Sequence, residues 1–372
     1  MNSLDRGVKM KKKSILLALL LVLTLIFLAA CGSQDQDQLR EVEQPVQEEL
    51  SDEEIDEQLD RIEAEYEADE EQRGADAEPS YSSTSPFTGM PLAEEYYKRA
   101  VAVAVENSPA ARPQSGLEEA EIIYEFMLEG GITRFLAIYW PDLPEKIGPI
   151  RSARPFLIET AAAYDALFLH AGASPDGFQM LNDNGILHLD EIYQSQYFWR
   201  SSKRRAPNNL YTGRPSLDDY LNNLAEREYP EQFNFITASV LSNFSPAEEI
   251  TINYWGDYNV LYRYNSLQNN YDRYIYDFET PHQVESGAHL NAKNIIVKFV
   301  ETSTKDQEGR QEINLNSSGE IKLFRDGTVI EGNWERNSNN QITYLDNNGS
   351  EIELNPGQSW IQLVPNGTEV NY

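Results

Sequence analysis

Residues 122–140 read IIYEFMLEGGITRFLAIYW. Two apolar runs, residues 122–128 and 132–140, flank the tripeptide at 129–131, which contains two consecutive glycines. A Gly-Gly pair between two strand-like runs is typical of a β-hairpin, because glycine adopts positive φ angles without strain. We therefore expect a hairpin at the centre of the first part of the chain.

Strands and helices alternate on both sides of this hairpin. Val101, Val103 and Val105 recur at every second position, which is the period of a strand. Pro155 falls in the first turn of an expected helix, where proline is favoured. The expected elements are a strand at 99–106, a helix at 152–164, a strand at 165–171 and helices around Gln179 and Leu217. This alternation predicts an α/β N-terminal domain with a mixed sheet over residues 81–232.

The pattern changes after about residue 230, where helical periodicity disappears and turn residues recur at short intervals. The clearest hairpin joins residues 321–325 to 328–334 through Asp326 and Gly327. Further strands are expected at 250–254, 261–264, 271–276, 295–300, 341–345, 351–354 and 360–364. They predict a β-rich, antiparallel α+β C-terminal domain over residues 233–372.

Composition excludes several classes of function. The 372 residues suffice for about two domains. Lys+Arg 30 against Asp+Glu 61 gives a net charge of -31, which would repel phosphate, so we expect no nucleic-acid partner. One cysteine and four histidines exclude internal disulfides and thiolate zinc sites. We expect no metal and no cofactor.

The N-terminus has the features of an export signal. Lysines at positions 9 and 11–13 precede an apolar run at 15–30, which is shorter than the roughly 20 residues of a spanning helix. Met10 would start a shorter signal than Met1 does. The run ends in Leu28-Ala29-Ala30-Cys31, which resembles the lipobox of bacterial lipoproteins.

This resemblance implies cleavage of residues 1–30 and attachment of diacylglycerol to Cys31, which would anchor the protein to the outer face of the cell membrane. A secreted protein with an unused thiol is the alternative.

Between residues 32 and 80, 20 Asp and Glu stand against three Arg, a net of -17. We expect an acidic tether over residues 31–80, partly helical at 52–72, that acts as a spacer or docks on a partner.

Several motifs resemble, in order, the YerB-like bacterial lipoproteins of the DUF3048 family. They are PFTGMP at 86–91, EN at 106–107, ARPQSG at 111–116, GITRF at 131–135, IGPIRSAR at 147–154, His170, APNNLYT at 206–212, FRDG at 324–327 and WI at 360–361. The resemblance implies two domains and a lipid-anchored envelope location, and it carries no assigned enzymatic activity. Members of the family often have histidine where Asn208 stands, which argues against a general base at that position.

Always-charged arginines recur where strands end or helices begin. Arg112 follows the first strand, Arg134 follows the glycine turn, and Arg151, Ser152 and Arg154 stand at an expected helix start, where anions bind well. Residues 195–215 add five basic side chains and no acidic one: Arg200, Lys203, Arg204, Arg205 and Arg214. These arginines predict a site for a phosphate-, pyrophosphate- or carboxylate-bearing ligand. Possible site-lining residues are Asn107, Gln114, Glu125, His170, Asn208, Asn209 and Tyr211.

The same arginines would also serve the fold if they paired with Glu106, Glu125, Glu129 and Glu159. Two functions therefore stay open. The first is a non-catalytic binding or scaffold protein for an anionic cell-wall or lipid-linked ligand, or for a protein partner. The second is a wall-polymer hydrolase or transferase that uses His170 with Glu125 or Ser174.

No Gly-x-Ser-x-Gly motif is present, and Ser174 before Pro175 is typical of a helix start. Glu125 and Glu129 could also be the paired carboxylates of a glycosidase.

Overall fold

The computed structural model describes residues 83–96, 98–236, 245–255, 258–275, 278–336 and 342–372. The expected signal segment, Cys31 and the acidic tether lie outside these ranges. Within them, no helix combines the length and the apolar character that crossing a bilayer requires.

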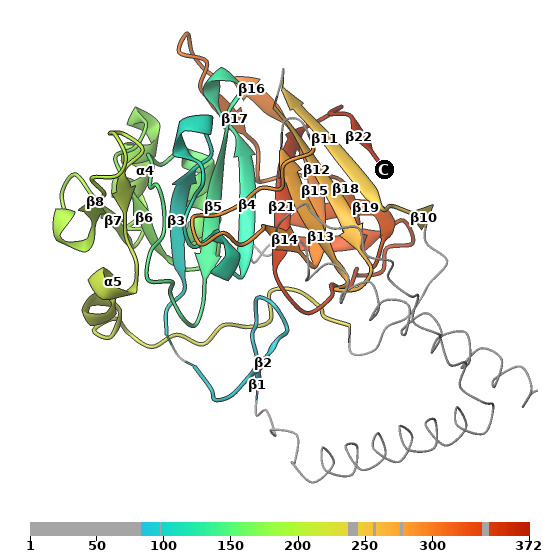
Figure 1. Ribbon diagram of the computed structural model, residues 1–372, viewed down its shortest axis with the longest axis horizontal. Coiled ribbons are helices and arrows are strands. Elements are labelled where there is room, and N and C mark those ends of the chain that lie inside the picture. The colour runs from blue at the N-terminus through green and yellow to red at the C-terminus, as the bar shows by residue number, and fades with distance from the viewer. Residues whose placement is uncertain (1–82, 97, 237–244, 256–257, 276–277, 337–341) are drawn as a thin grey trace, which may run out of the picture. The chain divides into compact units, whose positions relative to one another are not determined.

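An 11-stranded sheet runs through this part of the chain (Figure 1). Its strands, in spatial order, are β10 (Ser245–Pro246), β19 (Thr328–Arg336), β18 (Ser318–Arg325), β15 (Asn294–Val300), β21 (Ser359–Pro365), β4 (Ile122–Met127), β5 (Thr133–Tyr139), β3 (Val101–Glu106), β6 (Leu167–His170) and β7 (His188–Asp190), with β20 (Ile342–Asp346) paired to β19. The sheet is mixed, as the alternation of strands and helices predicts.

The predicted central hairpin is confirmed. β4 and β5 pair antiparallel, with Ile122 opposite Ile138 and Met127 opposite Thr133. Gly130 and Gly131 in the connection have φ angles of 74° and 70°. The hairpin at Asp326-Gly327 is confirmed as well, because β18 and β19 pair on either side of it.

β21 differs from the expected antiparallel arrangement of the second half of the chain. It is parallel to β15 on one side and to β4 on the other. A parallel neighbour needs a long crossover connection, and residues 301–358 supply it between β15 and β21. Residues 351–354, expected as a strand, form only isolated bridges, from Glu351 to Leu345 and from Leu354 to Phe235.

A second sheet covers one face of the large one. It has five strands in the order β14 (Asn291–Ala292), β13 (Asn270–Ile275), β12 (Tyr258–Asn265), β11 (Glu249–Trp255) and β22 (Val370–Asn371). Ile250, Val260 and Tyr262 of this sheet share one buried cluster with Val297 and Trp360 of the large sheet. One apolar core therefore lies between the two sheets.

The opposite face of the large sheet is covered by helices and loops. Phe156 and Leu157 of α3 (Pro155–Ala163) and Leu181 of α4 (Pro175–Asp183) join Ile296 and Phe126 in a second buried cluster. α5 (Arg214–Leu221) contributes Leu217 to the first cluster. The three predicted helices are thus present, and α3 begins at Pro155. Short paired strands complete the fold: β1 (Ser83–Thr84) with β2 (Pro91–Leu92), β8 (Trp199–Arg200) with β9 (Leu210–Tyr211), and β16 (Thr302–Thr304) with β17 (Gln311–Ile313).

The predicted domain boundary between residues 232 and 233 falls after α5, where the chain forms neither helix nor strand up to residue 236. The large sheet contains strands from both sides of this boundary, because β4 pairs with β21. The division into two domains stays a prediction.

Candidate anion-binding site

Two of the predicted site arginines contact one buried carboxylate. Arg134 of β5 lies opposite Glu106 of β3, and its Nη2 donates to Glu106 Oε2 at 2.9 Å. Arg151 Nε donates to the same oxygen at 2.8 Å. Burial by itself would raise the pKa of Glu106, but the two guanidinium groups lower it. Glu106 is therefore ionised at neutral pH and neutralises part of the arginine charge.

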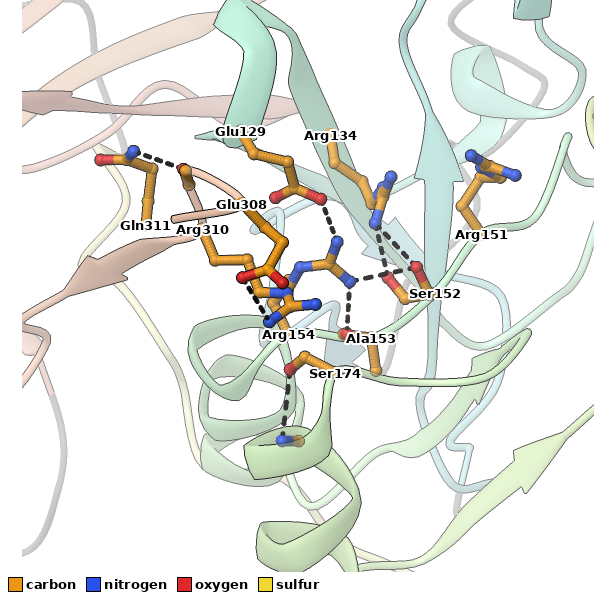
Figure 2. A network of polar contacts seen from close by, with 12 residues as sticks. Glu129, Arg134, Arg151, Ser152, Ala153, Arg154, Ser174, Glu308, Arg310 and Gln311 are labelled. Carbon is orange, nitrogen blue, oxygen red and sulfur yellow. Dashed lines mark hydrogen bonds and ion pairs between the residues drawn. The ribbon is translucent and has the colours of Figure 1, made fainter. Parts of the chain in front are cut away.

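Arg154 and Ser152 belong to the same cluster (Figure 2). Arg154 directly precedes α3 and forms an ion pair with Glu129. Its Nη1 donates to Ser152 Oγ at 3.1 Å and to the Ala153 carbonyl oxygen at 3.0 Å. Arg134 Nη1 donates to the Ser152 carbonyl oxygen at 2.7 Å. Ser152 thus binds two arginines of the protein itself.

The three guanidinium groups and two carboxylates leave one positive charge in this cluster. Arg134 and Arg154 are buried, whereas the side chain of Arg151 is 31% exposed. Within the described ranges, the terminal nitrogens of Arg151 donate no hydrogen bond to another residue. Arg134 and Arg154 therefore contribute to the fold through their glutamate partners, and Arg151 is the member that can reach a ligand.

Three predicted site-lining residues lie between the two sheets instead of in an open pocket. Glu125 of β4 forms a fully buried ion pair with Arg273 of β13, with Oε2 and Nη2 2.8 Å apart. Asn107 Nδ2 donates to the Tyr258 hydroxyl at 2.7 Å. Gln114 Oε1 is hydrogen-bonded to His282 Nε2 at 3.0 Å. The contacts of Glu125 and Asn107 join β4 and the end of β3 to the five-stranded sheet.

The contacts of His170 are structural. Its Nδ1 is hydrogen-bonded to the Gly172 carbonyl oxygen at 2.9 Å, and its Nε2 to His188 Nδ1 at 3.0 Å. Burial lowers the pKa of His170 to about 4, so the ring is neutral at pH 7. Ser174 accepts a hydrogen bond from the Gly177 amide and caps α4, as its position before Pro175 predicts.

The geometry therefore brings His170 into hydrogen-bonding contact with neither Glu125 nor Ser174, all three of which the structure describes. Across the described ranges, no three His, Cys, Asp or Glu side chains gather closely enough to hold a metal ion.

The basic segment at 195–215 forms a surface depression with Arg112. The depression has a volume of about 440 Å³ and is lined by Ala110, Arg112, Arg204, Arg205, Ala206 and Asn208. Arg204 donates to the carbonyl oxygens of Ala111, at 2.6 Å, and Pro113. Those acceptors are neutral, so they fix the orientation of the guanidinium group without cancelling its charge. Neither Arg204 nor Arg205 forms an ion pair with a carboxylate of the described chain.

The other candidates of this segment lie beside the depression. Asn209 Oδ1 accepts from Arg200 Nη1 at 3.0 Å, and Arg200 also pairs with Glu191. Tyr211 is buried beneath Lys146, whose Nζ lies 4.2 Å from the ring centroid. Arg112 donates to the Asn107 side chain and backbone at 3.1 and 2.6 Å. Arg112 therefore connects the depression to the buried network around Glu125.

Comparisons with known proteins agree with this architecture. Residues 87–228 match the family model described as the N-terminal domain of a protein of unknown function, DUF3048, and residues 250–361 match that of its C-terminal domain. The chain belongs to the DUF3048 family. It is 32% identical over 307 residues to "Putative lipoprotein YerB" of Bacillus subtilis (strain 168), which covers 79% of this chain and 90% of the relative.

A crystal structure of the YerB protein from Bacillus subtilis has the same fold. It superposes with a TM-score of 0.70 at 29% identity and covers 78% of this chain and all of the YerB chain in that structure. The resemblance expected from the motifs of this DUF3048 chain is therefore confirmed. The relative's name supports a lipoprotein, and the family description assigns no function.

Sequence analysis missed two buried cations. Arg273 lies in β13 among tyrosines, and nothing in that run distinguishes it from a surface arginine. Lys298 gives a clearer signal, because it interrupts the apolar run at 295–300, where every other side chain is Ile, Val or Phe. A single lysine in a strand buried on both faces indicates either a partner or a cavity.

Proposed function

We propose that this protein is a non-catalytic, extracytoplasmic lipoprotein, anchored through Cys31, that binds an anionic molecule of the cell envelope in the depression of Arg112, Arg204 and Arg205. The single observation that carries this proposal is the pair of guanidinium groups, on Arg204 and Arg205, that form no ion pair with a carboxylate of the described chain. In a chain of net charge -31, a local positive surface favours an anionic ligand.

The chemistry of the depression suits phosphate, pyrophosphate or carboxylate groups. Guanidinium groups present several N–H donors in one plane and match such oxyanions. The two carbonyl contacts of Arg204 hold its guanidinium before a ligand arrives, which lowers the entropy cost of binding. A wall polymer or a lipid-linked precursor has the required groups and is available outside the membrane. The exposed Arg151 would add a further contact for a long ligand.

The binding proposal predicts a stability increase on addition of ligand. We would measure thermal unfolding of the full chain in detergent with polyphosphate, a glycerol-phosphate polymer and a lipid pyrophosphate analogue. A ligand at a hundredfold excess over Kd stabilises by about 2.7 kcal/mol. Arg204→Gln with Arg205→Gln should weaken binding by about tenfold or more, because each removes a charged hydrogen-bond donor. Arg151→Gln should weaken only the binding of long ligands.

Arg214→Gln is the matched control, because Arg214 is an exposed arginine of the same segment that pairs with Glu145. This variant should bind as the wild type does. Equal binding by the Arg204/Arg205 variant and the wild type, or no stabilisation by any of the three ligands, would contradict the proposal and direct the search to protein partners.

The anchor is tested separately by fatty-acid labelling. Cells that express the wild-type chain should incorporate labelled palmitate into it, and Cys31→Ser should abolish this incorporation because the thiol that forms the thioether is lost. Ser33→Ala, two residues away, should be labelled normally. Label retained on Cys31→Ser would show that the lipid is absent from Cys31.

A further inference from the structure

A cavity of about 180 Å³ lies on the helix-covered face of the large sheet and shares no lining residue with the arginine depression. Its walls come from β4, α3, β15, β19, β20 and β21 and from the loops at 231–234 and 351–352. Ala163, Glu231, Asn234 and Glu351 are exposed lining residues, so they form its rim. The interior is polar for a site that lies against an apolar core.

Lys298 is the most unusual residue of this cavity. In β15, Ile296 and Val300 point to the same face of the sheet, because side chains alternate along a strand. Lys298 is 1% exposed, and its Nζ lies 3.5 Å from the centroid of the Trp334 ring. In the part of the chain that the structure describes, no oxygen atom accepts a hydrogen bond from this ammonium group. A buried cation without an acceptor is costly.

Two further donors of the cavity lack acceptors. The Tyr344 hydroxyl and Arg336 Nε are both buried, and neither has a hydrogen-bond partner among the described residues. By contrast, the hydroxyls of Tyr124 and Tyr164, which also line the cavity, bond to each other at 2.7 Å. Buried polar groups in native proteins are nearly always bonded. Three donors without an acceptor in one small cavity therefore point to a ligand that supplies oxygen acceptors.

We propose that this cavity binds a small organic carboxylate whose oxygen atoms accept hydrogen bonds from Lys298, Arg336 and Tyr344. A carboxylate has two oxygens with about four lone-pair positions, which suffices for these three donors, and its negative charge compensates the two cations. A water molecule occupies about 30 Å³ of liquid, so 180 Å³ admits a short-chain acid. This site is separate from the arginine depression, and neither proposal depends on the other.

Binding should depend on pH through Lys298. The charged groups around this amine are Arg336 and Glu159, together with Glu231 and Glu351 at the rim, where Glu351 accepts from Asn234. Burial and then Arg336 lower the pKa of Lys298 to about 7, whereas Glu159 opposes the shift. A carboxylate binds the charged amine, so its affinity should fall about tenfold per pH unit above pH 7.

The test is calorimetric titration of the full chain in detergent with acetate and propionate at pH 6 and pH 8.5. We expect saturable binding that is at least tenfold weaker at pH 8.5. Lys298→Met, which keeps the side-chain length, should abolish binding at both pH values. Tyr344→Phe removes one donor with little change in side-chain volume, and it should weaken binding three- to tenfold. Arg204→Gln with Arg205→Gln, which alters only the separate depression, should leave the pH-dependent component of binding in place.

Chloride and propylamine at the same ionic strength are the controls. Saturable binding of chloride with the affinity of propionate would overturn the assignment to carboxylates, and binding of propylamine would overturn the assignment to anions. Lack of saturable propionate binding at pH 6, or wild-type affinity in a folded Lys298→Met variant, would overturn the site itself.

Discussion

Arg273→Met should lower the free energy of unfolding by about 3–5 kcal/mol, because it leaves the carboxylate of Glu125 buried without its cation. Both side chains are 0% exposed, and Nη2 and Oε2 are 2.8 Å apart. Burial acts to lower the pKa of Arg273, but Glu125 together with the surrounding tyrosines Tyr262, Tyr258 and Tyr254 raises it. We would measure urea unfolding at pH 7.

The loss of unfolding free energy in Arg273→Met should be large because Arg273 contacts several groups at once. Its Nη1 donates to the Tyr262 hydroxyl at 2.5 Å, and its Nε donates to His282 Nδ1 at 3.2 Å. Its guanidinium carbon lies 4.5 Å from the Trp360 ring centroid, which adds a cation–π contact. His282 is neutral, because burial and then Arg273 and Arg112 hold its pKa well below its ordinary value. Removal of one cation therefore breaks contacts with all of these groups at once.

Two controls separate burial from charge. Arg263→Met breaks the exposed pair of Arg263 with Glu249 on neighbouring strands, and it should cost only about 0–1 kcal/mol. Arg273→Met combined with Glu125→Gln should be more stable than Arg273→Met alone, because the uncompensated charge is gone. Equal losses of unfolding free energy for Arg263→Met and Arg273→Met would show that the buried ion pair contributes no more to stability than the exposed one.

Lys298→Met should have the opposite effect and stabilise the ligand-free protein by about 4 kcal/mol at pH 7. The folded-state pKa of Lys298, about 7, lies below its ordinary value of 10.5. In the unfolded chain the amine keeps its proton up to pH 10.5, so the unfolded state binds more protons between pH 7 and 10.5. The wild type should therefore gain stability as the pH rises through this window.

The measurement is chemical unfolding of wild type and variant at several pH values from 6 to 10. The stability difference should be largest below pH 7 and shrink towards pH 10, because the pH then approaches the unfolded-state pKa of 10.5 and the advantage of the charged amine in the unfolded state disappears. Lys322→Met is the matched control, since Lys322 lies at the surface and pairs with Glu331. A stability difference that does not change with pH would show that Lys298 titrates normally. Saturating propionate should also reduce the gain at pH 6, since the ligand stabilises only the wild type.

A destabilising lysine in a core strand is consistent with a ligand site. Proteins commonly retain stability costs at positions that function requires. Together, the two predictions distinguish cations that hold the fold from a cation that is available for binding. Arg273 donates hydrogen bonds to several groups, whereas Lys298 contacts the face of Trp334 and donates no hydrogen bond within the described ranges.

Much of the local structure could be predicted from the sequence. The alternation of Val101, Val103 and Val105, the glycine turn at 130–131 and the Asp326-Gly327 turn correspond to β3, the β4–β5 hairpin and the β18–β19 hairpin. Ser174 caps α4 as expected. These features depend on residues within a few positions of one another, and backbone sterics and strand period act over that range.

The candidate site was predicted less completely. The sequence predicted that Arg134 and Arg154 bind an anionic ligand. In the structure, the pairing of β3 with β5 places Glu106 directly against Arg134. From the sequence, Glu125 was a candidate for catalysis. In the structure it is paired with Arg273, which lies 148 residues later in the chain and belongs to the other sheet. A sequence gives the types of charged side chains and leaves open which of them neutralise one another, because that depends on contacts between distant segments.

The sequence by itself determined the hairpins and helices of this protein, its family membership and the acidity that disfavours nucleic acid. Only the tertiary structure decided that β21 lies between β15 and β4, that Arg204 faces carbonyl oxygens, and that Lys298 faces a cavity. The physical reason is the range of the forces. Local propensities act between near neighbours in the chain, whereas burial and charge compensation depend on packing between segments that are far apart in the chain.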